Sequence, residues 1–290
     1  MKPVRDRRLL AATLSGLALA FAAPVLAAAA PAATAEPLAP APVLPTALYA
    51  FGDSYSDIGF GYLDGNGPTA VAYLARALGL ELSHTKAPDW KGKSLAFAVS
   101  GGGTGAGGTR EARLGYGMIN QAREFAALVS SGQVAFDPER TLFFVAGGLN
   151  DRRLTTDQTE ANLTEVVSIL KGAGARHVRL ANLPEKIPAF AEVAIRLNPM
   201  LTALPAKLSA QLGIDVRPSR WGSYFDGVMT SAAEFGFTNT KDACAGRALF
   251  NQDATPCSAP GAYYYYHGDH PSTAVHRLVG ARLADEVTAN

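Results

Sequence analysis

The sequence has little charge and no excess of either sign. Of its 290 residues 18% are charged, with 26 Lys and Arg against 25 Asp and Glu, so the formal net charge is +1. Proteins that bind nucleic acids cover phosphates with Lys and Arg, and this chain offers no surplus of either. We therefore expect no nucleic-acid partner. Hydrophobic residues make up 48% of the chain, which is enough for one large domain with a substantial core.

The N-terminus lacks an apolar run long enough to span a bilayer comfortably. Four basic residues precede an apolar run over 9–21, and small residues follow it up to Ala27. This pattern is typical of a cleaved signal peptide over 1–27 and predicts a secreted or periplasmic protein, with an uncleaved anchor as the alternative. Without this segment, which holds four basic residues and Asp6, the formal charge changes from +1 to −2. The export route stays open.

Cysteine is almost absent. Cys244 and Cys257 are the only two, and they lie close together in the sequence. A disulfide persists in an exported protein, so we predict that these two residues pair. Two buried free thiols are the alternative.

The rest of the chain divides into a linker and a long segment in which two kinds of apolar pattern alternate. Residues 28–45 are almost all Ala and Pro, which cannot build a core, and we predict a linker there. Beyond it, strand-like apolar runs alternate with segments of helical periodicity. The predicted strands are 46–51, 94–99, 141–148 and 177–184, and the predicted helices are 70–80, 119–132, 161–175 and 272–287. This order predicts one α/β domain over 46–290, a three-layer α/β/α sandwich with a mostly parallel central sheet.

Three loops that leave predicted strands carry candidate functional groups: "FGDSYSD" at 51–57, "VSGGGTG" at 99–105 and "GGLND" at 147–151. In parallel sheets functional groups gather at this edge. We expect Ser54 to open a helix, where its hydroxyl and backbone N–H would face a developing oxyanion. Asn150 can donate its side-chain amide to the same oxyanion. Capping or turn roles are the alternatives for both residues.

The glycine-rich loop does not fit a dinucleotide-binding site, although 103, 105 and 108 match G-x-G-x-x-G. No segment of apolar periodicity begins within the glycines, and no lysine completes a phosphate loop. Glycine there instead permits a close approach of the backbone, whose N–H groups can face a ligand oxygen. An ordinary surface loop is the alternative.

In chain order, these three loops and "HPSTAVHRL" at 270–278 resemble the GDSL family of SGNH-fold hydrolases. The resemblance covers 46–290. The stretch "FDGVMTSAAEFGFTNTKDAC" at 225–244 is similar to the segment before a cysteine pair in the family's bacterial secreted lipases and esterases. The resemblance implies the SGNH, flavodoxin-like variant of the predicted sandwich.

The resemblance also implies a chemistry. Ser54 would be the nucleophile and His270 the general base, and the backbone N–H groups of Ser54 and Gly101 together with the Asn150 amide would hold the oxyanion. The substrate would be a small-molecule or lipid ester, and transient contact with a membrane or lipid surface is compatible with it. No metal or organic cofactor is required. The oligomeric state and the natural ester do not follow from the sequence.

One position departs from the family pattern. Members commonly carry an aspartate three residues before the catalytic histidine, and here that position is His267. Three explanations compete: a Ser54–His270 dyad oriented by a backbone carbonyl or water, a carboxylate from elsewhere with Asp269 as the local candidate, or a catalytically silent ligand-binding protein. If the missing carboxylate limits the rate, His267→Asp raises the turnover number. Acyl transfer to an alcohol is a further alternative, and a metal site at 267–270 is not expected.

Overall fold

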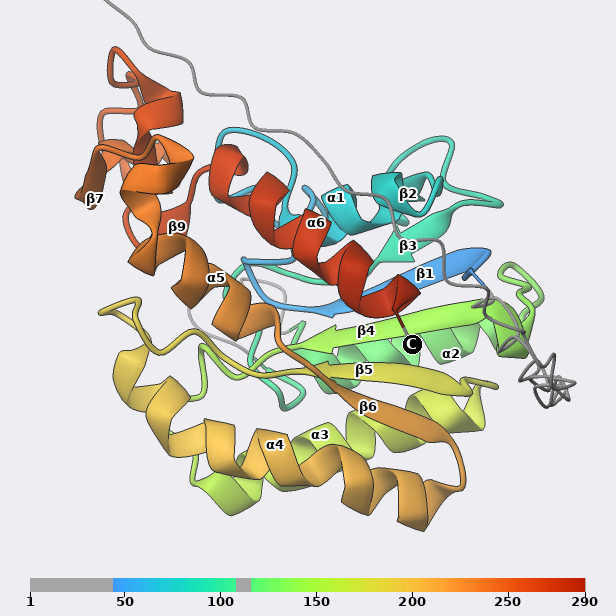
Figure 1. The fold of residues 1–290 in the computed structure, drawn as a ribbon. Coiled ribbons are helices and arrows are strands. Elements are labelled where there is room, and N and C mark those ends of the chain that lie inside the picture. The colour runs from blue at the N-terminus through green and yellow to red at the C-terminus, as the bar shows by residue number, and fades with distance from the viewer. Residues whose placement is uncertain (1–43, 108–115, 290) are drawn as a thin grey trace, which may run out of the picture. The chain divides into compact units, whose positions relative to one another are not determined.

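The computed structural model describes residues 44–107 and 116–289, and these form a layered α/β domain (Figure 1). The predicted signal peptide and the linker up to residue 43 lie outside the described residues. A parallel sheet of order β2-β3-β1-β4-β5-β6 forms the middle layer. Its strands are β1 (Ala47–Gly52), β2 (Leu82–Ser83), β3 (Ser94–Ala96), β4 (Thr141–Ala146), β5 (His177–Ala181) and β6 (Asp215–Ser219).

Helices cover both faces of this sheet (Figure 1). On one face α6 (Thr273–Thr288) packs between α1 (Ala70–Ala77) and α5 (Trp221–Thr230), and on the other α3 (Thr156–Gly172) packs between α2 (Met118–Ser130) and α4 (Ala191–Leu212). All residues of β4 are buried, as expected for a strand covered on both sides. The predicted three-layer α/β/α sandwich is confirmed.

Helix α3 begins five residues before the predicted segment. Thr155 caps it, accepting a hydrogen bond from the backbone N–H of Gln158, while the Gln158 side chain accepts from the N–H of Thr155. This capping box satisfies two N–H groups that the first turn would otherwise leave unpaired. Because this first turn is polar, a search for apolar periodicity does not detect it.

The sequence pattern assigns no element to 185–262, where the structure has α4, β6, α5 and a further strand, β7 (Asn239–Ala245). Helix α4 contains Pro199 and Pro205, which each remove a backbone hydrogen bond from the helix. Its buried side, which includes Leu197, Leu201 and Leu208, nevertheless packs into the core. Packing therefore outweighs the local preference against a helix here. No helix of the described residues is long and apolar enough to cross a membrane.

A second, smaller sheet lies beside the main one in the chain's C-terminal third (Figure 1). Its order is β7 (Asn239–Ala245), β8 (Tyr263–His267) and β9 (His270–Pro271), with β8 and β9 antiparallel. Gly268 adopts φ +48° in the tight turn between them. This turn presents His267 and His270 as a pair across the β8–β9 ladder.

The predicted disulfide between Cys244 and Cys257 is confirmed. We expect the double variant Cys244→Ser/Cys257→Ser to lower the free energy of unfolding by about 3 kcal/mol, because a bridge between residues 13 apart restricts the unfolded chain by this amount. Urea unfolding of the variant and of the wild type measures the difference. A loss below about 0.5 kcal/mol would contradict this expectation, and wild type unfolded under reducing conditions is the matched control.

Candidate active site

The three candidate loops meet at the carboxyl edge of the main sheet. Strands β1 and β4 pair at Gly52 and Ala146, and a Cβ added to Gly52 would lie 2.2 Å from the carbonyl oxygen of Ala146. Only glycine permits this approach. The loops after β1, β3 and β4 therefore start side by side, and Ser54, Gly101 and Asn150 all line one cavity.

The prediction that a helix begins at Ser54 is wrong. The chain makes a single turn there, closed by the N–H of Asp57 donating to the carbonyl of Asp53 over 3.0 Å, and α1 begins only at Ala70. The side chain of Asp57 explains the early end, since it accepts backbone N–H groups of Gly59 and Ser100 (both 2.8 Å) and so bends the chain away from helical geometry. Ser54 thus lies in a hydrogen-bonded turn without a long helix behind it.

The side chains of Ser54 and His270 lie within hydrogen-bonding distance. The His270 Nε2 is 2.8 Å from the Ser54 Oγ, and the two residues are 216 positions apart in the sequence. Next to Ser54, the Tyr55 hydroxyl donates to the backbone carbonyl of Asp269 over 2.6 Å. This bond ties the turn that carries Ser54 to the hairpin that carries His270. The predicted nucleophile and base are therefore brought together and held there.

The candidate oxyanion groups are also adjacent. The Asn150 Nδ2 donates to the carbonyl of Gly102 over 3.0 Å, which ties the third loop to the glycine-rich loop. Gly101 adopts φ +80°, a conformation that favours glycine. An amide nitrogen carries two hydrogens, so Asn150 retains one donor beyond the bond to Gly102.

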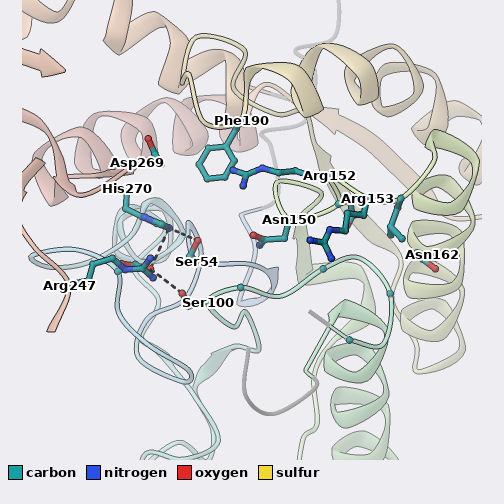
Figure 2. A pocket seen from close by; sticks show the side chains of 17 residues that line it. Ser54, Ser100, Asn150, Arg152, Arg153, Asn162, Phe190, Arg247, Asp269 and His270 are labelled. Atoms are coloured by element: carbon teal, nitrogen blue, oxygen red, sulfur yellow. Dashed lines mark hydrogen bonds and ion pairs between the residues drawn. The ribbon is translucent and has the colours of Figure 1, made fainter. Parts of the chain in front are cut away.

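These groups open into one cavity of about 1030 Å³ (Figure 2). Ser54 and His270 lie at one end, and Asn150 lies between them and the charged side chains of Arg152 and Arg153. The Arg152 guanidinium donates to the carbonyl of Ala189 over 2.7 Å. With its volume of about 1030 Å³, the cavity is much larger than a single acetyl group.

A buried carboxylate that the sequence analysis missed lies against the histidine pair. Asp64, in the loop between β1 and α1, has a fully buried side chain. Its Oδ2 is 3.4 Å from the His270 Nε2, and its Oδ1 is 3.5 Å from the Nδ1 of His267. Asp64 also forms an ion pair with Arg247 and accepts a hydrogen bond from the Ser100 hydroxyl over 3.1 Å.

Comparison with known proteins identifies the family. The family model described as GDSL-like Lipase/Acylhydrolase matches residues 48–283. The chain belongs to this GDSL family. The protein is therefore a carboxylic ester hydrolase.

Solved structures similar to this GDSL hydrolase share little sequence with it. A carbohydrate acetylesterase from Sinorhizobium meliloti has 16% identity, with 84% of this chain and 98% of that one covered and a TM-score of 0.44. The aryl esterase of M. smegmatis has 15% identity, 83% and 98% coverage and a TM-score of 0.45. A member of the lipolytic G-D-S-L family from Veillonella parvula has 12% identity, 82% and 96% coverage and a TM-score of 0.44. No curated protein matches the sequence.

Burial dominates the electrostatics of His270 in the GDSL hydrolase. It lowers the pKa of the imidazole below the ordinary 6.5, while the negative charge of Asp64 acts to raise it and Arg247 to lower it. Asp269 and the backbone carbonyl of His267 also act to raise the pKa. The net direction is downward, so the ring is neutral and able to accept a proton at neutral pH.

The local carboxylate candidate, Asp269, does not face the His270 ring (Figure 2). Asp269 is exposed, and Figure 2 shows its side chain directed away from the His270 ring. The described residues contain no cluster of His, Cys, Asp and Glu that could hold a metal ion. Only the sequence "YLDGNG" could have pointed to Asp64, and an aspartate before a glycine reads as an ordinary turn.

Proposed function

We propose that this protein cleaves carboxylic esters through an acyl-enzyme formed on Ser54, with His270 as the general base. The observation that carries the proposal is the 2.8 Å contact between the Ser54 Oγ and the His270 Nε2, both of which line the cavity. A serine hydroxyl is a weak nucleophile until a neighbouring base takes its proton. The lowered pKa of His270 keeps that base neutral.

The reaction would proceed in two halves. In the first, Ser54 attacks the ester carbonyl while the His270 Nε2 takes the hydroxyl proton, and the oxyanion is held by the backbone N–H groups of Ser54 and Gly101 and by the amide of Asn150. The imidazolium then protonates the departing alcohol. In the second half, water attacks the acyl-enzyme by the same proton path and releases the acid.

The substrate we propose is a small-molecule or lipid ester. The cavity of about 1030 Å³ can take an acyl or alcohol portion well beyond acetyl, so we do not assign a short-chain preference. We also propose that the protein is exported. The basic and apolar segments of 1–27 and the pairing of Cys244 with Cys257 support this location, because disulfides persist in oxidising compartments.

The pH dependence tests this proposal. We expect kcat/KM for p-nitrophenyl butyrate to rise with pH along an acid limb whose midpoint lies below 6.5, because catalysis needs neutral His270 and burial lowers its pKa. His276, a further buried histidine near the site, has its pKa lowered to about 3 by burial, so it stays neutral over this range. Enzyme preincubated at each pH and assayed at pH 7.5 controls for unfolding. A midpoint above 7, or no hydrolysis of acetate, butyrate or octanoate esters, would refute it.

A further inference from the structure

The reacting nitrogen of His270 faces two groups. Its Nε2 is 2.8 Å from the Ser54 Oγ and 3.4 Å from the Asp64 Oδ2, so nucleophile and carboxylate share one edge of the ring. The other ring nitrogen, Nδ1, is buried and makes no hydrogen bond of normal geometry among the described residues. The backbone of His267, which pairs with His270 across the β8–β9 ladder, acts to raise the pKa of the ring. The usual arrangement, with a carboxylate on Nδ1, is therefore absent from this part of the chain.

We propose that Asp64 supplies the negative charge that stabilises protonated His270, in place of the aspartate that His267 replaces. Asp64 would be a positioning residue that acts through His270 from the loop after β1. The inference rests on the proposed roles of Ser54 and His270. With Asp64 in this role, a carboxylate supports Ser54 and His270, and a dyad that lacks a carboxylate is not required.

The other buried carboxylates near the loops are either partly protonated or bonded to other groups. Burial raises the pKa of Asp53 to about 7, so this group carries only part of a charge at neutral pH. Asp57 accepts backbone N–H groups from its own turn and from Ser100. Asp151 accepts the backbone N–H and hydroxyl of Thr104 and the hydroxyl of Thr159. Among the residues that the structure describes, Asp64 is the one carboxylate that forms a contact with the His270 Nε2, at 3.4 Å.

The surroundings of Asp64 keep it ionised. Burial acts to raise its pKa, but the nearby ring of His267, the charges of His270 and Arg247 and the hydroxyl of Ser100 together hold it below the usual value. His267 therefore gains a role that an aspartate at its position would not have. Its Nδ1 lies 3.5 Å from the Asp64 Oδ1, where an N–H directs its positive end at the carboxylate.

The proton balance leaves Asp64 unchanged. The proton of the Ser54 hydroxyl moves to the His270 Nε2 as the new C–O bond forms, and the resulting N–H lies beside the Asp64 Oδ2. It then passes to the departing alcohol oxygen as the ester C–O bond breaks. Asp64 remains a carboxylate throughout and lowers the energy of the imidazolium by its charge.

Several titratable groups surround His270, and each affects its titration differently. Asp64 and Asp269 act to raise its pKa, Arg247 acts to lower it, and His276 on α6 stays neutral. Removing Asp64 should therefore lower the pKa of His270 further, and removing Arg247 should raise it. These two variants should move the acid limb of the pH profile in opposite directions, which a purely structural role would not do.

The first experiment compares Asp64→Asn with wild type. We expect kcat for p-nitrophenyl butyrate to fall by about 10- to 100-fold with little change in KM, and the acid limb to move to lower pH. Asp269→Asn, which removes an exposed carboxylate beside the same histidine, is the matched control and should change kcat by less than about threefold. Arg247→Gln should move the acid limb to higher pH, and it tests the same charge coupling even if Asp64→Asn folds poorly.

The second experiment uses His267→Asp in both backgrounds. In the wild type it would place a second carboxylate against Asp64, where two like charges cannot both ionise freely, so we expect no gain or a loss in kcat. In Asp64→Asn the new carboxylate has no such neighbour, and we expect at least about fivefold recovery of kcat.

Both experiments separate this inference from the proposed function. If Asp64→Asn melts near the wild-type temperature yet keeps its kcat and its acid limb, or if His267→Asp raises kcat in the wild type and fails to rescue Asp64→Asn, the role of Asp64 is overturned while Ser54 and His270 stand. If the wild type hydrolyses no ester, the proposed function fails first.

Discussion

Replacing Ser54 with alanine should lower kcat for p-nitrophenyl acetate and butyrate by at least about 10⁴-fold. The serine supplies the atom that becomes acylated, so its loss leaves only the oxyanion donors and substrate binding to accelerate attack by water. The side chain is nearly buried, at 7% exposure, and alanine fills the same turn without its hydroxyl. Steady-state hydrolysis, with a thermal melt to confirm the fold, measures the effect.

Ser56 provides the matched control for this variant. It lies in the same turn and is fully buried, but it does not line the cavity. We expect Ser56→Ala to keep kcat within about threefold of wild type, because its hydroxyl is not placed to reach a substrate carbonyl. Residual activity above about 1% in Ser54→Ala would assign the nucleophile to another residue.

Replacing Asn150 should produce the second largest loss of kcat. We expect Asn150→Ala to lower kcat by about 10²- to 10³-fold with a smaller change in KM, because a donor aimed at the developing oxyanion acts mainly in the transition state. The same variant also removes the 3.0 Å hydrogen bond to Gly102, so some of the loss would come from the glycine-rich loop. Steady-state kcat and KM measure the combined effect.

Two further variants separate these contributions. Asn150→Asp keeps the shape but replaces the donor with an acceptor that repels the oxyanion, so its loss should exceed that of alanine. Asn162→Ala removes an amide from the same cavity that instead donates to Thr104 over 3.1 Å, and it should change kcat by less than about threefold. Equal effects of the alanine variants at 150 and 162 would contradict the oxyanion role.

Local sequence pattern was sufficient for the layers of the fold. Strand β4 is a run of apolar residues that is buried throughout, and α2 and α6 lie within two residues of their predicted bounds. Such elements follow from periodicity, since each apolar stripe must face the core. The pattern failed at α4, where Pro199 and Pro205 oppose a helix that tertiary packing maintains, and at Ser54, where the Asp57 side chain ends the turn.

The residues of the site also divide into those that the sequence indicated and those that only the structure revealed. The sequence by itself indicated Ser54 and Asn150, which follow strands of a parallel sheet, and its resemblance to the GDSL family added Gly101 and His270. Only the tertiary structure decided that Asp64 faces His270 and that Arg247, 183 residues further along the chain, pairs with it. A buried charge is stabilised by whichever groups surround it after folding, and no local spacing records which groups those will be.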